Sequence, residues 1–343
     1  MGDDEIQAAS GGVIVESKEW YISAYAPEGV PTSDHLKLRS VPISLAIDSI
    51  PDHHVALETL LISIDPYLHA RMTGTEDGLY MPQHNLNEVF GIARVIESKD
   101  SNYTKGDIVI SAFLPVAEFA VLPSDLLARK IDTTPGISLT DYLSSLDITG
   151  VPGFSAWVGI EVVAQPKPGS NVFISSAAGG VGMYAGQLAK LKGCRVIGST
   201  GSEMTSSAII GYIPFYFPDG IDVYLDNVGG EMLEAVLNHV NKHAHIILCG
   251  MISQYNKVWT ERYGVRNLLN MIGKEVKMEG FLIGSYLDRF PDFTKDMESY
   301  IKQGKITCKH MIYYGIDSFL ESLGSLFSSS NIGKVVIQVK SLH

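Results

Sequence analysis

The 343-residue sequence has only three cysteines, Cys194, Cys249 and Cys308, which stand far apart. Three widely spaced thiols cannot form a disulfide framework or a four-thiolate zinc site, and they favour a reducing compartment. Positive charge is scarce as well, because 26 Lys and Arg stand against 38 Asp and Glu, for a net charge of −12. An acidic field of this size repels phosphate backbones and anionic lipid, so we expect neither nucleic acid nor a membrane surface as a partner.

Long apolar runs are also missing from the chain. No stretch approaches the ~18 uncharged apolar residues of a spanning helix, and the acidic start of the sequence has no apolar run behind it. We therefore expect a cytoplasmic protein. The length allows about two domains of ordinary size, with room for a cleft between them.

The pattern of apolar residues changes along the chain. Residues 1–135 show short alternating runs broken by turns, such as 57–64, which are typical of β-strands. Residues 136–305 alternate apolar strands with helical stretches, and residues 306–343 return to short strands. The pattern predicts an α/β protein in which a doubly wound parallel sheet interrupts a mainly β domain. Strands of the parallel sheet are predicted at 171–175, 195–198, 221–225, 245–249 and 276–281.

A glycine-rich turn follows the first of these strands. The sequence AAGGVG at 177–182 lies between this strand and a predicted helix at 181–191. It matches the dinucleotide-binding fingerprint, with alanine in place of the first glycine. Glycine lets the backbone approach a pyrophosphate, and the free N–H groups of the following helix attract the anion. The alternative interpretation is a tight turn without a ligand.

The end of the second strand distinguishes between the two nicotinamide cofactors. NAD enzymes usually place a carboxylate there for the ribose hydroxyls. This sequence has Ser199, Thr200 and Gly201 at that point and no acid before Glu203. Hydroxyls and backbone amides suit a 2′-phosphate better, so NADP(H) is the predicted cofactor, although nothing in this stretch is basic.

Seven motifs follow one another along nearly the whole chain: IDPYL with RM (64–68, 71–72), VPGFSA (151–156), AAGGVG (177–182), DNVGG (226–230), CGMISQYN (249–256), MEGF (278–281) and NIGK (331–334). Together they resemble the zinc-independent medium-chain dehydrogenase/reductases, and within that family the plant NADPH-dependent 2-alkenal (double-bond) reductases and the prostaglandin reductases. The resemblance implies a Rossmann domain at 136–305 and a partly open, barrel-like (GroES-like) catalytic domain made of 1–135 and 306–343. It also implies a small-molecule substrate and a homodimer.

The resemblance further implies roles for individual residues. The pyrophosphate would lie on Ala177, Gly179, Gly180, Val181 and Gly182. Other cofactor contacts are expected at Ser155, Ser199, Thr200, Gly201, Asn227, Cys249, Tyr255, Phe281, Leu282 and Asn331. Tyr67 and Tyr80 would line the substrate pocket; the alternative is an ordinary core aromatic for Tyr67 and a surface-loop aromatic for Tyr80.

These positions suggest a reaction. In a carbonyl conjugated to a C=C bond the β-carbon is electrophilic, so a hydride from NADPH can add there if a donor stabilises the enolate. Tyr255 is the predicted donor, and the α-carbon takes its proton from Tyr255 or from water; alternatively, only the ring of Tyr255 matters. The predicted activity is reduction of α,β-unsaturated aldehydes or ketones. The alternatives are a quinone oxidoreductase of the same superfamily and a nucleotide-binding relative without turnover.

Three other features of the sequence offer less chemistry. His53 and His54 are adjacent and have no third ligand at suitable spacing, so we expect a solvated loop and no metal site. The sequence GFSAW at 153–157 lacks the second glycine of a nucleophile elbow, which argues against a hydrolase. Cys249, at a strand end, is expected to be a small buried residue and not a nucleophile.

One segment is shorter than the predicted fold requires. Between its second and fourth strands a doubly wound sheet normally has a helix, an edge strand and another helix, on the order of forty residues. Residues 203–220 provide 18, and they include no lysine of the kind that relatives use for the 2′-phosphate. Smaller shortfalls are expected after Glu88 and Phe113. Either the printed chain lacks residues of the protein, or the protein is a shortened form with a bare sheet edge and a weaker cofactor site.

The short segment has the length of one crossover helix, although not of a complete extra unit, but its composition is not expected to form a helix. Gly211 and Pro214 interrupt residues 206–218, and both residue types disfavour a helix interior.

Overall fold

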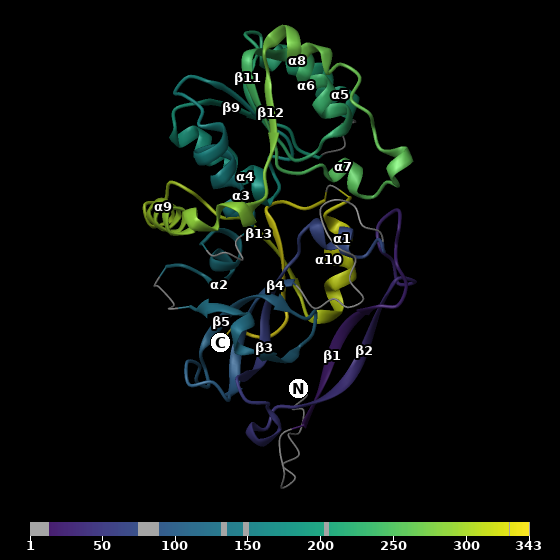
Figure 1. Ribbon diagram of the computed structural model, residues 1–343, viewed down its shortest axis with the longest axis vertical. Helices are drawn as coiled ribbons and strands as arrows, with labels where there is room; N and C mark the ends of the chain where they lie inside the picture. Colours follow the sequence, from purple (N-terminus) through teal and green to yellow (C-terminus); the bar gives the residue numbers. More distant parts are fainter. Residues whose placement is uncertain are drawn as a thin grey trace.

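The computed structural model describes residues 14–74, 89–131, 136–146, 151–201, 206–328 and 330–342. Its parallel sheet and its mainly antiparallel sheet lie in different parts of the molecule (Figure 1). The strands are β1 (Ile14–Ile22), β2 (Leu36–Ser44), β3 (His54–Ser63), β4 (Val89–Ser98), β5 (Ile108–Leu114), β6 (Phe119–Pro123), β7 (Leu127–Lys130), β8 (Asn171–Ile174), β9 (Arg195–Gly198), β10 (Ile221–Asp226), β11 (Val240–Leu248), β12 (Lys277–Gly280), β13 (His310–Tyr314) and β14 (Lys334–Gln338). The helices are α1 (Tyr67–Arg71), α2 (Leu139–Asp141), α3 (Val151–Trp157), α4 (Gly180–Leu191), α5 (Ser206–Tyr216), α6 (Gly230–His239), α7 (Ile252–Tyr255), α8 (Leu269–Lys274), α9 (Phe290–Lys302) and α10 (Phe319–Ser325).

The larger sheet joins the two ends of the chain. Its order is β13-β14-β3-β4-β5-β7, with β6 also paired to β3, and only β13 and β14 run parallel to each other. Strand β3 is buried along most of its length because both of its faces are covered. Leu57 and Ile62 pack into one apolar cluster, whereas Leu61 packs into another that extends to the parallel sheet. A two-stranded antiparallel sheet, β1-β2, lies beside it.

The five described strands of the parallel sheet have the order β12-β11-β10-β8-β9. Its side chains alternate between two helical layers, as the pleat requires. Ile174 and Leu225 face the cluster that includes α4, whereas Phe173 and Tyr224 stack at 5.2 Å on the opposite face, which α5 and α6 cover. This doubly wound sheet, together with the mainly β domain, confirms the predicted fold class. The domain limits 1–135, 136–305 and 306–343 stay a prediction.

The prediction that residues 206–218 are not helical is wrong. The structure places α5 there, with Pro214 inside it. Burial of Ile213 and Phe217 against Phe173 outweighs the cost of Gly211 and Pro214, and the Phe217 N–H donates to Ile213 O at 2.9 Å. The Arg195 guanidinium also caps the helix end, donating to Tyr216 O at 2.6 Å.

Helix α5 is the one described helix between β9 and β10. It crosses β8 on the same face of the sheet as α6, and Figure 1 shows α5 and α6 next to each other. Strand β9 is therefore the last strand at its side of the described sheet. The two explanations of the short segment both stay predictions. None of the described helices is long and apolar enough to span a bilayer.

Candidate active site

The predicted cofactor residues gather at one edge of the parallel sheet. Because all of its strands run the same way, the segments that follow β8 to β12 meet at the carboxyl ends of the strands. Ligands of open α/β sheets bind in the crevice at this edge. The structure thus brings together the glycine turn, Ser199, Asn227, Tyr255 and Phe281 from five separate parts of the chain.

The glycine turn packs so closely against the start of α4 that its last position requires glycine. Ser176 has a φ of +51°, the Gly179 N–H donates to Ser176 O at 3.0 Å, and α4 begins one residue later. A Cβ at Gly182 would overlap Ser176 O. The first-turn N–H groups of α4 therefore face a close backbone cradle, which fits a dinucleotide pyrophosphate.

The end of β9 lies directly against this turn. The Ala177 N–H donates to Ser199 O at 2.7 Å, and the Ser199 N–H donates to Ile174 O at 3.0 Å. Ser199 is buried, whereas Thr200 and Gly201 are exposed. Among the described residues of this strand end, 198–201, there is no carboxylate, consistent with the sequence-based argument for NADP(H) over NAD.

Asn227 is held in place by a buried network that the sequence did not reveal. Its backbone N–H donates to Ser175 Oγ at 2.9 Å, and its side-chain amide donates to Ser175 O at 2.8 Å. Beneath it, Asp226 Oδ1 accepts from the Tyr224 hydroxyl at 2.7 Å and from the N–H groups of Val228 and Gly229, both at 2.9 Å. Burial raises the pKa of Asp226, while these hydrogen bonds oppose the shift. The feature of the sequence that could have indicated this network is Asp226, a carboxylate directly after a predicted buried strand.

Tyr255 lies next to Asn227. It ends α7, and its hydroxyl oxygen accepts the Met251 N–H at 3.0 Å. A Cβ at Gly250 would come within 3.2 Å of this hydroxyl and 3.6 Å of Asn227 O, so glycine leaves the tyrosine close to the strand ends. The Ile252 N–H also donates to Asn227 O at 3.1 Å, tying the two loops together.

Cys249 stands at the end of β11 beneath this loop. Burial, and next the nearby Asp226 carboxylate, raise the pKa of the Cys249 thiol to about 12. The thiolate is the nucleophilic form, and at neutral pH it is nearly absent from such a site. Cys249 is half-buried against the apolar cluster that includes α4, and its lack of a nucleophilic role stays a prediction.

Ser155 and Phe281 meet this edge from the opposite side. Ser155 is buried on α3, and the π-helical turn after α3 brings Gly159 against Phe281 and Leu225. Phe281 follows β12 and packs edge-on to Tyr286, with ring centroids 6.2 Å apart. The next residue, Leu282, is 54% exposed, which leaves its side chain available for contact.

A buried ion pair fastens the last motif to the larger sheet. Lys334 Nζ donates to Asp65 Oδ1 at 2.5 Å and to Ile64 O at 2.6 Å. Burial lowers the pKa of Lys334, and Asp65 opposes that shift. Next to it, the Gly333 N–H donates to Ala178 O at 2.7 Å, which sets the segment with Asn331 beside the glycine turn. The sequence marked Asp65 and Lys334 only as parts of motifs and assigned them no role.

The predicted substrate residues lie on the mainly β side. Tyr67 is half-buried at the start of α1, with its ring edge-on to Phe90 at 5.9 Å and under the Arg71 guanidinium at 5.0 Å. Tyr80 lies outside the described residues. Helix α1 is linked to the Tyr255 loop, because His69 Nε2 bonds to Gly29 O and the Gly29 N–H donates to Asn256 O at 2.9 Å.

Comparison with known proteins identifies the family. Two family models match, the N-terminal domain of oxidoreductase over residues 18–128 and zinc-binding dehydrogenase over residues 180–300. The chain is 35% identical to a 2-alkenal reductase (NADP(+)-dependent) of Nicotiana tabacum, over 95% of this chain and 98% of the relative. This chain belongs to the zinc-independent medium-chain dehydrogenase/reductases of the alkenal reductase type.

Other members agree with this assignment. The (+)-pulegone reductase of Mentha piperita is 31% identical over 95% of this chain and 99% of its own. CurA of Vibrio vulnificus, solved in complex with NADPH, matches with a TM-score of 0.83 and 28% identity over 94% of this chain and 99% of its own. This dehydrogenase/reductase is an NADP(H)-dependent oxidoreductase that acts on a small molecule. Among its described residues, no group of three or more His, Cys, Asp or Glu is placed to hold a metal ion.

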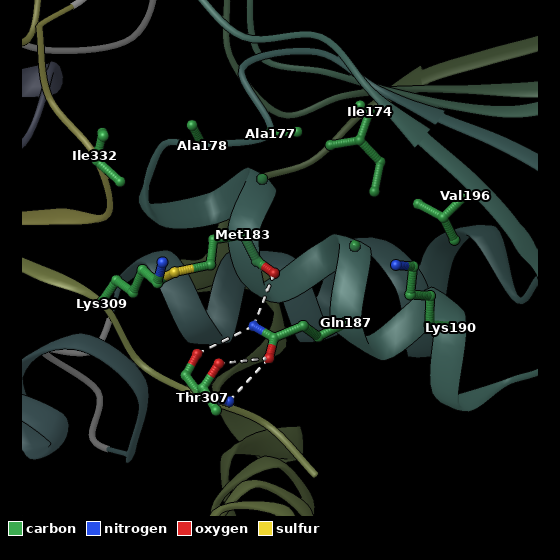
Figure 2. A pocket seen from close by; sticks show the side chains of 13 residues that line it. Ile174, Ala177, Ala178, Met183, Gln187, Lys190, Val196, Thr307, Lys309 and Ile332 are labelled. Carbon is green, nitrogen blue, oxygen red and sulfur yellow. Dashed lines mark hydrogen bonds between the residues drawn. The ribbon is translucent and has the colours of Figure 1, made fainter. Parts of the chain in front are cut away.

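A cavity of about 500 Å³ opens beside the glycine turn of this oxidoreductase. Ala177, Gly182 and Gly198 form its wall at the strand ends. Figure 2 shows Lys190 on α4 and Lys309 before β13 at opposite ends of the row of side chains along the helix. Between them, the Gln187 amide accepts the Thr307 N–H at 2.8 Å and donates to Thr307 O at 3.1 Å.

Proposed function

We propose that this oxidoreductase reduces the C=C bond of α,β-unsaturated aldehydes and ketones with NADPH. The observation that carries the proposal is the position of the Tyr255 hydroxyl. It lies beside Gly250 and Asn227 at the carboxyl ends of β10 and β11, where the nicotinamide half of a dinucleotide on the glycine turn would reach. An acid is therefore available close to the expected site of hydride transfer.

The chain's own residues position the substrate and supply the donor. Bound NADPH supplies the hydride, which adds to the β-carbon of the substrate. The Tyr255 hydroxyl donates to the carbonyl oxygen, where negative charge develops, and the α-carbon then takes a proton from Tyr255 or from water. The Met251 N–H, which donates to the phenol oxygen at 3.0 Å, stabilises charge that builds up on that oxygen as its proton is shared.

Two further features support this assignment. The tobacco relative is a 2-alkenal reductase, which is the reaction class proposed here. The half-buried ring of Tyr67, with Phe90 beside it, offers a flat apolar wall on the substrate side. Assembly as a homodimer and a cytoplasmic location remain predictions.

The test is NADPH oxidation with three substrate classes. Purified protein is mixed with NADPH and, separately, with an enal, an enone or a quinone, while the absorbance of NADPH is followed. We expect turnover with the enal or the enone, and mass spectrometry should show the saturated carbonyl product. Oxidation with the quinone alone would reassign the protein to the quinone oxidoreductases. If none of the three supports turnover although NADPH binds, the protein is a nucleotide-binding relative without this activity.

A further inference from the structure

The described end of β9 has no cation for the 2′-phosphate of NADP(H). The sequence contains no Lys or Arg between Arg195 and Lys242, a stretch that includes β9, α5 and β10. A 2′-phosphate carries nearly two negative charges, and the whole chain has a net charge of −12. Any cations that bind this phosphate must therefore come from elsewhere in the fold and reach the strand end where the ribose is expected to bind.

The short connection explains why another place exists. Helix α5 covers the α6 face of the sheet, where Ile213 packs on Phe173 and Tyr224. On the opposite face α4 stands next to the edge strand with no described helix beyond it, and Ile174 and Val196 line the cavity of about 500 Å³. The cavity thus occupies the side of α4 that a second crossover helix would otherwise cover.

The other cations near the glycine turn already have partners. The Arg195 guanidinium donates to Tyr216 O at 2.6 Å on the α5 side of β9. Lys192 pairs with Glu161 at 2.7 Å, and Lys334 is buried against Asp65. In the part of the chain that the structure describes, the side chains of Lys190 and Lys309 have neither a hydrogen bond nor an ion pair, and both residues are exposed.

We propose that Lys190 and Lys309 hold the 2′-phosphate of NADP(H) in this cavity. Both line it from opposite ends, Gly198 at the end of β9 forms part of its wall, and none of its described lining residues is Asp or Glu (Figure 2). A lysine binds phosphate as a mobile point charge, so two lysines on flexible stems can converge on one phosphate group. The inference rests on the proposed placement of the pyrophosphate at the glycine turn and is independent of the substrate.

The test measures binding without turnover. Isothermal titration calorimetry gives the Kd of NADP+ and of NAD+ for the wild type, Lys190→Met, Lys309→Met and the double variant. Loss of a charged hydrogen bond costs about a factor of ten in affinity, so we expect the Kd of NADP+ to rise about tenfold in each single variant and further in the double variant. The Kd of NAD+ should stay within about twofold, because NAD+ has no 2′-phosphate.

The matched control is Lys305→Met. Lys305 is exposed on the same segment as Lys309 and does not line the cavity, so this variant loses the same charge and should bind NADP+ like the wild type. Equal weakening of NADP+ and NAD+ in the cavity variants, or an unchanged preference in the double variant, would overturn the proposal. A wild type that binds neither dinucleotide would instead overturn the proposed function together with it.

Discussion

The strand edge has a proposed nicotinamide end and a proposed adenosine end, and these two ends are built by different means. At the nicotinamide end, the loops after β8, β10 and β11 are joined to one another by the network of Ser175, Asp226 and Asn227 and by the Tyr255 loop. At the adenosine end, the edge strand β9 is followed by exposed Thr200 and Gly201. A cavity lies beside α4, where a second crossover helix would otherwise cover it. The first end fixes polar side chains in position, whereas the phosphate site proposed at the second end relies on the mobile charges of two lysines.

The largest expected effect is a loss of stability when the hydrogen-bond network around Asp226 is removed. Asp226→Ala leaves the Tyr224 hydroxyl and the N–H groups of Val228 and Gly229 buried without their acceptor. We expect the free energy of unfolding to fall by about 3–5 kcal/mol, measured by urea denaturation followed by circular dichroism.

The control for this change lies at the other end of the same strand. Asp222 is half-buried and accepts from the Asn171 N–H at 2.8 Å and from the Asn241 amide at 2.7 Å. Asp222→Ala should therefore cost about 1 kcal/mol, since fewer and less buried donors lose their partner. Equal losses for the two variants would show that the carboxyl end of β10 is not specially reinforced.

The second prediction separates chemistry from binding at the nicotinamide end. Tyr255→Phe removes the proposed donor to the carbonyl oxygen, and the loss of one such donor typically lowers turnover about 100-fold or more. The Kd of NADPH should change by less than about threefold, because the pyrophosphate and the 2′-phosphate keep their sites. Stopped-flow turnover with an enal and fluorescence titration with NADPH provide the two measurements.

A control variant tests whether a disturbed α7 loop, and not the missing hydroxyl, lowers the turnover of Tyr255→Phe. Ser253 is exposed on the same helix, and its hydroxyl donates to Val228 O at 2.6 Å. Ser253→Ala disturbs α7 without touching the phenol, so turnover should remain near that of the wild type. If this variant is as slow as Tyr255→Phe, loop geometry and not the hydroxyl accounts for the loss.

Local patterns in the sequence predicted most of the strand edge. Apolar runs located β8, β10 and β11, and the glycine turn required only the spacing of small residues between a strand and a helix. The contacts between distant segments could not be read in this way. Lys334 and Asp65 are 269 positions apart, and only the pairing of β14 with β3 brings them together.

The failures of the sequence analysis have physical causes. Helix α5 was missed because tertiary burial of Ile213 and Phe217 outweighs the intrinsic cost of Pro214. Helix α9 was missed although its buried Phe293 and Met297 are four residues apart, which is helical spacing. The role proposed for Lys190 and Lys309 could not be predicted from the sequence, since a cavity between a helix and a returning segment leaves no mark in either local sequence.

The smallest expected effect is a loss of dinucleotide affinity when the backbone at the end of β9 is displaced. A Cβ at Gly198 would overlap the Cβ of Ala177, so Gly198→Ala should push the end of β9 away from the glycine turn. Overpacking of this kind costs about 1–3 kcal/mol, and we expect the affinity for NADP+ and for NAD+ to fall together by roughly tenfold. Calorimetry with both dinucleotides distinguishes this result from the lysine variants, which should affect NADP+ alone.

Gly280→Ala is the matched control for Gly198→Ala. Gly280 ends β12 at the opposite side of the sheet, and its added Cβ would meet Leu248 O at 3.8 Å and Leu248 Cβ at 4.0 Å, which are ordinary contacts. Binding of both dinucleotides should therefore stay close to that of the wild type. A Gly198→Ala variant that weakens NADP+ while leaving NAD+ unchanged would mean that this strand end holds the 2′-phosphate directly. In that case the two ends of the site would be equally fixed by the backbone, and the cavity lysines would not be needed to explain the preference for NADP(H).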